Sequence, residues 1–251
     1  STMCSFLLSS FILKNLSWLN YFMQTRGPDH TSHVTKRGYS FVHNLLHMTG
    51  ERVIQPFSYG GIDGGKEAVQ ILFNGEIYNW PELKKQLENS GNVPRWRGSS
   101  DTEVLLVAIS VWGLAETLKR VRGMFAFALW DCAKKRLTLV RDRIGEKPLY
   151  YGKTNGQFAF ASELKAISAL SESSLELEPD AMALMLRYGY VPEPYSIYKN
   201  IYKLPAGMMI SVSTDGQIGE PQPYWSFSEF VAEQQKNPLQ LSDEEAVDEL
   251  E

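Results

Sequence analysis

The stretch Phe73-Asn74-Gly75-Glu76-Ile77-Tyr78-Asn79 decides how this chain of 251 residues is interpreted. It places a side-chain amide beside a bare glycine amide, directly after the strand-like apolar run Val69-Gln70-Ile71-Leu72. An oxyanion that develops during attack on a carbonyl needs two N–H donors. Asn74 and the next backbone N–H supply them if Gly75 lets the chain turn. The stretch therefore predicts an oxyanion hole, which requires a nucleophile elsewhere in the chain.

The composition indicates a soluble globular protein that acts on small molecules. With 43% hydrophobic and 12% aromatic residues, the chain can build a substantial core as one large or two small domains. The net charge of -4 arises from 25 basic and 29 acidic residues that are mixed along the sequence. The sequence therefore shows no basic face of the kind that binds nucleic acid or an anionic membrane.

The cysteines and histidines do not form a metal site or a disulfide framework. Only two cysteines are present, Cys4 and Cys132, and the four histidines all lie within residues 30–47. They show no CxxC pair and no HExxH spacing, which argues against zinc and favours a reducing cytoplasm. The apolar run 6–13 is far shorter than the roughly 20 residues that span a bilayer, so we expect the first core strand there. Cys132 lies in a turn signal without a neighbouring base and is interpreted as structural.

The hydrophobic patterns predict a layered α+β domain, because strands and helices are grouped and do not alternate regularly. Further strands are expected at residues 39–46 and 69–73 and, as an antiparallel meander, at 125–130, 136–141, 149–152 and 158–161. Helices are expected at residues 16–25, 81–91, 163–170 and 179–188. Another helix is expected to follow Ser100-Asp101-Thr102-Glu103 and to end near Trp112, with the serine or the aspartate as its cap.

The composition of the sequence changes near residue 203. The polar stretch 221–238 is typical of a linker. Ser242 and Glu245 then form a capping box that opens another helix. We therefore expect residues 1–205 to form one domain, and residues 206–251 to be a linker and the start of a truncated second domain.

Short blocks of distinctive sequence occur in order between residues 3 and 166. They are Met3-Cys4-Ser5, Arg26-Gly27-Pro28-Asp29, Gln55-Pro56, Phe73 to Asn79, Ser100 to Glu103, Gly123 to Ala128, Arg141 to Tyr150 and Ala161 to Ala166. In order and spacing they resemble the glutaminase domain of class II glutamine amidotransferases, in the branch of the glutamine-hydrolysing asparagine synthetases. The run Tyr190 to Pro205 resembles that family's passage toward its synthetase domain.

The resemblance implies a four-layer αββα sandwich of the N-terminal-nucleophile hydrolase type. It makes Cys4 the nucleophile that attacks the side-chain amide of glutamine, and the α-amino group of Cys4 the general base. An α-amine has a pKa of about 7.7–8.0 and a thiol about 8.5, so the amine can take the thiol proton near neutrality. Three residues precede Cys4 in this sequence. We hypothesise that their removal frees the amine.

The resemblance also assigns the groups that hold the substrate. Asn74 and the Gly75 amide would bind the oxyanion. Glu76 and Asp101 would hold the amino end of glutamine, since an anionic partner suits an ammonium group. For Asp101 a helix cap without a ligand is the alternative, and the two roles are compatible.

One position departs from the family pattern. The family carries an arginine that binds the α-carboxylate of glutamine, and this sequence has Leu45 at that position. Leu45 and the two residues that follow it, Leu46 and His47, complete the predicted substrate site. A charge-assisted bond of this kind is worth about 1.5–3 kcal/mol, or roughly ten- to a hundred-fold in affinity. Asn44, His47 or another cation compensates for the missing arginine, or glutamine binds weakly.

The resemblance therefore predicts hydrolysis of glutamine to glutamate and ammonia through a thioester on Cys4. The ammonia would pass to an ATP-dependent, asparagine-synthetase-like amidation in a C-terminal domain. No metal or cofactor is expected in this chain, because ATP and Mg²⁺ belong to that other domain. The expected partners are glutamine and the synthetase domain, without nucleic acid or membrane, and a homodimer in the cytoplasm is compatible with these features. Two alternatives stay open: a weak or inactive glutaminase-like docking domain, and an amidotransferase whose acceptor is not aspartate.

Overall fold

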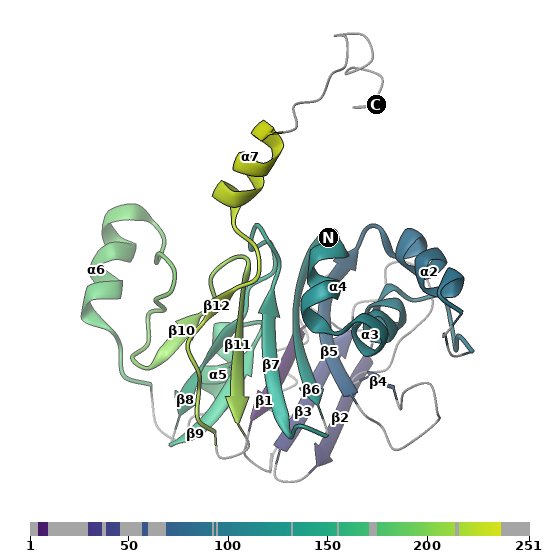
Figure 1. The fold of residues 1–251 in the computed structure, drawn as a ribbon. Coiled ribbons are helices and arrows are strands. Elements are labelled where there is room, and N and C mark those ends of the chain that lie inside the picture. Colours follow the sequence, from purple (N-terminus) through teal and green to yellow (C-terminus); the bar gives the residue numbers. More distant parts are fainter. Residues whose placement is uncertain are drawn as a thin grey trace.

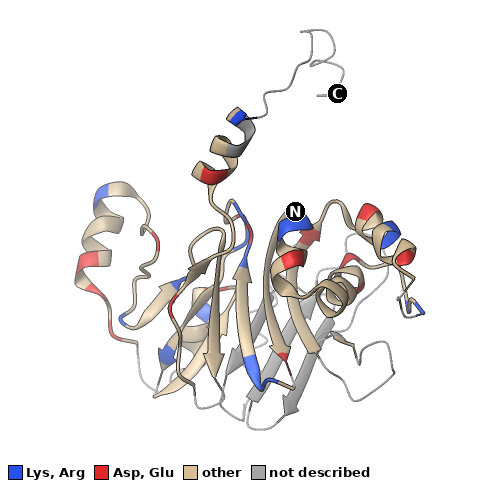
Figure 2. Cartoon of the chain, in the orientation of Figure 1, with Lys and Arg blue, Asp and Glu red and all other residues tan. Residues whose placement is uncertain are grey.

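The computed structural model describes residues 5–9, 30–36, 39–45, 57–59, 69–91, 93, 95–131, 133–154, 156–170, 175–213 and 216–236 of the chain. For residues 5–9, 30–36, 39–45, 57, 170, 233 and 234 it describes the backbone alone. Among all these residues no helix combines the length and the apolar character needed to cross a membrane. Figure 2 shows basic and acidic residues interspersed along the described elements, as the mixed charge pattern predicts.

Two antiparallel sheets form the centre of the molecule (Figure 1). The first sheet has the strand order β10 (Ile201–Lys203), β8 (Tyr150–Thr154), β9 (Gln157–Ala161), β1 (Ser5–Ser9), β3 (Tyr39–Leu45) and β2 (His30–Lys36). The second has the order β12 (Gln222–Pro223), β11 (Met208–Ser213), β7 (Arg136–Arg141), β6 (Gly123–Asp131), β5 (Val69–Ile77) and β4 (Phe57–Tyr59). The two sheets pack face to face: residues of β5, β6, β7 and β11 share a core with residues of β8 and β9, and β1 contacts β5.

Helices cover the outer faces of both sheets. On the second sheet lie α2 (Trp80–Asn89), α3 (Asp101–Trp112) and α4 (Leu114–Arg120), with α3 directly against β5. On the first sheet α5 (Leu164–Leu170) packs against β8 and β9. Two more helices, α6 (Pro179–Tyr188) and α7 (Phe227–Lys236), extend from the sandwich, and α7 projects at one end of it (Figure 1).

The period-two alternation of strand β6 explains the layering. Phe125 and Phe127 belong to a core cluster shared with α2, α3 and α4, whereas Ala126 and Ala128 belong to a cluster shared with strands of the first sheet. A third cluster joins the first sheet to α5. Three cores separate four layers, so the predicted αββα sandwich is confirmed.

The assignment of strands to sheets differs from the single predicted meander. Strands β6 and β7 pair in the second sheet, whereas β8 and β9 pair in the first. The chain crosses between the sheets over residues 142–149, which the local sequence pattern does not reveal.

The segment after residue 205 also takes part in the fold. Strand β11 pairs with β7, and the stretch predicted as a linker contains β12 and α7. The division into two domains stays a prediction. The predicted helix at residues 16–25, Cys132 and the capping box at Ser242 lie outside the described residues.

Candidate active site

The Asn74 side chain points into the space between the two sheets. Asn74 lies inside strand β5, two residues after Leu72, whose side chain belongs to the core between the sheets. Asn74 is only 2% exposed. Its Oδ1 accepts no hydrogen bond from the described part of the chain. Because buried polar atoms are normally paired, an unpaired amide oxygen here indicates a place for a ligand or for solvent.

The backbone at Gly75 approaches β6 too closely for any side chain. A Cβ at Gly75 would lie 2.1 Å from the carbonyl oxygen of Met124 and 2.6 Å from the Cα of Phe125. The φ angle of Gly75 is 148°, which residues with a Cβ rarely adopt. On the opposite strand, a Cβ at Gly123 would lie 2.1 Å from the carbonyl oxygen of Glu76. The chain therefore continues as strand β5 through Gly75, where the sequence analysis allowed for a turn, and the glycine keeps β5 paired with β6.

The N–H of Gly75 points away from β6. Phe125 on β6 lies opposite Gly75. Its backbone groups bind Asp142 and not Gly75: the N–H of Asp142 donates to the Phe125 carbonyl at 2.8 Å, and the N–H of Phe125 donates to Oδ2 of Asp142 at 3.2 Å. Gly75 and Phe125 thus form a non-hydrogen-bonded pair. The N–H of Ile77, two residues on, has the same direction as that of Gly75 and donates to Asp101. The Gly75 donor therefore lies on the side of β5 that Asp101 occupies.

The carboxylate of Asp101 joins the start of α3 to the end of β5. Its Oδ2 accepts the N–H of Ile77 at 2.9 Å, and its Oδ1 accepts the N–H of Thr102 at 2.7 Å. Burial raises the pKa of Asp101 above its ordinary value, the hydrogen bonds from Ile77 and Thr102 lower it, and the nearby carboxylate of Glu76 raises it. The structure therefore brings together two of the predicted substrate residues, Glu76 and Asp101. A pair of carboxylates suits a cationic group such as an ammonium.

The N-terminal cap of α3 is Ser100. Its Oγ accepts the N–H of Glu103 at 3.2 Å. Of the two caps that the sequence left open, the serine is therefore the one used. Because Ser100 supplies the cap, both carboxylate oxygens of Asp101 are available to bind β5 and its own first turn.

A buried aspartate that the sequence did not single out supports the strand behind Gly75. Asp142 is 1% exposed. Its Oδ1 accepts the N–H groups of Ile144 at 3.0 Å, Gly145 at 2.7 Å and Glu146 at 3.1 Å, and its Oδ2 accepts those of Phe125 at 3.2 Å and Lys147 at 3.1 Å. The carboxylate thus organises the loop after β7 and fixes Phe125 opposite Gly75. An aspartate placed just before a glycine-containing turn was the available signal.

Comparison with known proteins identifies the family. The family described as "Glutamine amidotransferase domain" matches residues 8–225. The chain belongs to this family. The amidotransferase domain is 35% identical over 205 residues to asparagine synthetase [glutamine-hydrolyzing] 1 of Bacillus subtilis. The aligned region covers 80% of this chain and 30% of that relative. The domain is 31% identical over 198 residues to asparagine synthetase [glutamine-hydrolyzing] 3 of the same organism, covering 77% and 31%. The domain therefore spans about a third of the length of these curated relatives.

Solved structures share the fold of the amidotransferase domain. Glutamine phosphoribosylpyrophosphate amidotransferase from B. subtilis, complexed with ADP and GMP, superimposes with a TM-score of 0.55 at 18% identity, covering 90% of this chain and 44% of that one. A structure titled as the allosteric regulatory enzyme of purine biosynthesis gives a TM-score of 0.56 at 17% identity, covering 90% and 43%. At these identities the likeness establishes the fold alone.

Some predicted site residues of the amidotransferase domain fall outside the part of the chain that the structure describes. Cys4, Leu46 and His47 lie outside the described residues, and their roles stay predictions. Leu45 ends strand β3, with its Cα paired to that of His30, and only its backbone is described. Strand β1 begins at the residue that follows Cys4 and contacts β5, the strand of Asn74.

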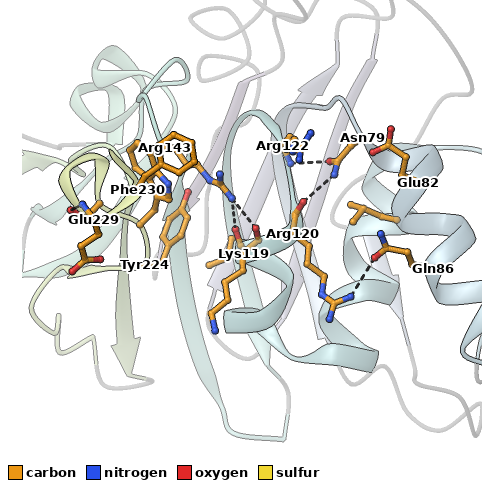
Figure 3. Close-up of a pocket in the computed structure, with 14 residues that line it drawn as sticks. Asn79, Glu82, Gln86, Lys119, Arg120, Arg122, Arg143, Tyr224, Glu229 and Phe230 are labelled. Carbon is orange, nitrogen blue, oxygen red and sulfur yellow. Dashed lines mark hydrogen bonds between the residues drawn. The ribbon is translucent and has the colours of Figure 1, made fainter. Parts of the chain in front are cut away.

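A separate pocket of the amidotransferase domain has a volume of about 860 Å³. It lies between α2, α4 and the segment Tyr224–Phe230, and no described residue of the predicted site lines it (Figure 3). Its lining includes Glu82, Lys119, Arg122, Arg143, Trp225 and Phe230. We call it the exit pocket, because the described chain leaves the sandwich along its rim.

Proposed function

We propose that this domain hydrolyses the side-chain amide of glutamine, with Cys4 as the nucleophile and with Asn74 and Gly75 as the donors to the oxyanion. The observation that carries the proposal is the geometry of β5: a buried Asn74 amide and a Gly75 N–H that points to the side of Asp101. Membership of the glutamine amidotransferase family supports the same reaction.

Each step balances with groups of the chain, glutamine and water. The sulfur of Cys4 attacks the δ-carbon of glutamine while the thiol proton moves to the α-amine of Cys4. The N–H groups of Asn74 and Gly75 stabilise the negative charge on the carbonyl oxygen. When the C–N bond breaks, the leaving nitrogen takes the proton from the α-ammonium and departs as ammonia. Water then attacks the thioester, and glutamate and the free thiol are released.

The spacing along β5 supports glutamine as the substrate. Gly75 and Ile77 are two residues apart, a separation of about 6.7 Å along a strand. Asp101 is bound to Ile77, so its carboxylate is displaced from the Gly75 donor by a similar distance. That displacement matches an extended glutamine whose ammonium lies at Asp101 and whose side-chain carbonyl lies at Gly75.

We extend the proposal to the longer relatives, whose names describe glutamine-hydrolysing asparagine synthetases. The ammonia would pass to an ATP-dependent amidation in a further, C-terminal domain, with aspartate as the simplest acceptor. ATP and Mg²⁺ would bind in that domain, and the cytoplasm is the expected location.

A second candidate function is a docking domain with weak or absent glutaminase activity. Leu45 favours it, since an uncharged side chain stands at the position where the resemblance implies an arginine. An unpaired α-carboxylate would bind roughly ten- to a hundred-fold more weakly.

Glutamate release distinguishes the two candidates. We expect release from protein trimmed to begin at Cys4, and none from Cys4→Ala or from protein that begins at Ser1. No release from the trimmed protein would favour the docking domain, and release that survives Cys4→Ala would contradict the mechanism.

A matched pair of asparagines tests the oxyanion donors. Asn74→Ala is expected to lower turnover by about a hundred- to a thousand-fold. Asn79→Ala is the control, because the Asn79 amide is already engaged: its Nδ2 donates to the carbonyl of Arg120 at 3.0 Å, and its Oδ1 accepts the N–H of Arg122 at 2.9 Å. The control is expected to lose stability and to keep its turnover.

A further inference from the structure

Aromatic side chains stand exposed where the described chain leaves the sandwich. Phe227 is 68% exposed and Phe230 is 43% exposed, both on α7. Their rings pack on Trp225, at centroid distances of 6.1 Å and 6.2 Å. Trp225 and Phe230 also line the exit pocket. Aromatic rings clustered at the mouth of a pocket are typical of a surface that another protein surface covers.

The walls of the exit pocket are fixed by hydrogen bonds (Figure 3). The Asn79 side chain joins the start of α2 to the end of α4 through the backbone of Arg120 and Arg122. Nη2 of Arg143 donates to the carbonyl of Lys119 at 2.9 Å, and its guanidinium lies 5.8 Å from the ring centre of Trp225. The pocket is therefore preformed, and a partner does not have to order it.

The charge on the exit pocket is incompletely balanced. Its lining carries the cations Lys119, Arg120, Arg122 and Arg143 and the anions Glu82 and Glu229. Arg120 and Lys119 are paired with Glu116, and Arg143 is bonded to carbonyls of α4. The guanidinium of Arg122 pairs with no carboxylate in the described part of the chain. An acidic side chain of a partner fits this position.

The course of the chain beside the exit pocket indicates which partner covers it. The pocket rim is the segment that leads into α7, and the described chain ends at Lys236, at the end of α7. The curated relatives are about three times longer than the matched part. Any domain that follows Lys236 is tethered beside the exit pocket, which raises its effective concentration there above that of any separate protein.

We propose that the exit pocket and the exposed rings of Phe227 and Phe230 form the docking surface for the ATP-dependent domain that follows in the longer protein. This inference rests on the proposed function for the identity of that domain. The domain seats apolar side chains against Trp225 and Phe230 and an acidic side chain on Arg122. Docking at this end holds the acceptor domain in a fixed orientation to the amidotransferase sandwich.

Hydrogen–deuterium exchange tests the docking surface without any assay of activity. The longer protein is compared with this chain of 251 residues, and the backbone amides of residues 119–122 and 224–230 are followed. We expect their exchange to be at least about ten-fold slower in the longer protein. Equal exchange in the two proteins would overturn the proposal. Slower exchange that appears in the short chain as its concentration rises would assign the surface to a second copy, and would also overturn it.

A coupling assay in the longer protein gives the functional test. Arg122→Glu combined with Phe230→Ser is expected to keep glutamine hydrolysis and ammonia-dependent amide synthesis, while glutamate forms in at least about two-fold excess over amide. The matched control is Lys153→Glu combined with Leu177→Ser, two exposed positions outside the exit pocket: Lys153 lies on β8 of the first sheet, and Leu177 is 49% exposed. Equal glutamate and amide in the pocket variant would contradict docking. Absence of glutamate from the unsubstituted protein would instead contradict the proposed function, and the exchange experiment would still decide the docking.

Discussion

The carboxylate of Asp101 accepts a hydrogen bond from the N–H of Ile77 at 2.9 Å, and this contact fastens the start of α3 to the end of β5. It places an anion two residues along the strand from the Gly75 donor, on the same side of β5. The contact also brings Asp101 near Glu76. A single hydrogen bond thus relates the group proposed for the ammonium of glutamine to the group proposed for its oxyanion.

Asp101→Asn separates binding from folding. The variant keeps one acceptor for the backbone N–H groups but loses the negative charge, so we expect the KM for glutamine to rise roughly ten- to a hundred-fold. Steady-state glutamate release checks this value. Thr102→Ser is the control, because it keeps the backbone N–H that donates to Asp101. An unchanged KM in Asp101→Asn would remove Asp101 from the substrate site.

The same variant tests the pKa of Asp101. Burial raises the pKa in the folded state, so the folded protein holds the proton more tightly than the unfolded chain does. The free energy of unfolding should therefore fall as pH rises from the ordinary aspartate pKa of about 3.9 to the higher folded value. Denaturant titrations across this range should show the fall in the wild type, after subtraction of the Asp101→Asn curve. A difference that rises with pH would mean that the folded pKa is lowered.

Gly75→Ala should disrupt the pairing of β5 with β6. The new Cβ would lie 2.1 Å from a backbone oxygen, which no side-chain movement relieves, and we expect a loss of about 3 kcal/mol or more in the free energy of unfolding. Gly91→Ala is the control: its φ is 77°, but no atom lies within 4 Å of the added Cβ, so the expected loss is about 1 kcal/mol. Equal losses would show that the close approach at Gly75 has no energetic weight.

Asp142→Asn should weaken the contact that holds Phe125 of β6 opposite Gly75 of β5. An amide offers one acceptor oxygen where the carboxylate offers two, so the loop after β7 or the N–H of Phe125 loses its partner. We expect a loss of about 2–3 kcal/mol in stability. Urea denaturation measures it, and glutamine turnover at a temperature where the variant is folded should also fall. A variant as stable as the wild type would contradict the role assigned to Asp142.

Leu45→Arg should strengthen glutamine binding. If Leu45 stands at the carboxylate-binding position, the arginine restores a charge-assisted bond and lowers the KM roughly ten- to a hundred-fold. Leu45→Met is the control for the change in shape alone. An unchanged or higher KM with arginine would show that Leu45 does not occupy that position.

Much of the sandwich could be predicted because the patterns that define its strands and helices lie within short stretches of sequence. The alternation in β6 and the Ser100 cap of α3 are visible in short windows of sequence, and both appear in the structure. The role of Gly75 in strand pairing was not visible in the local sequence, because the glycine allows the close approach of β6, which lies about 50 residues away in sequence. Asp142 was missed for the same reason, since its contact with Phe125 depends on tertiary structure.

The formation of a thioester on Cys4 tests the central claim most directly. Protein trimmed to begin at Cys4 is mixed with glutamine, quenched in acid and analysed by intact mass and peptide mapping. The account predicts one glutamyl group on the peptide that contains Cys4, which disappears as glutamate accumulates and is absent in Cys4→Ala. Steady glutamate release with no adduct on Cys4, or an adduct on another residue, would contradict it.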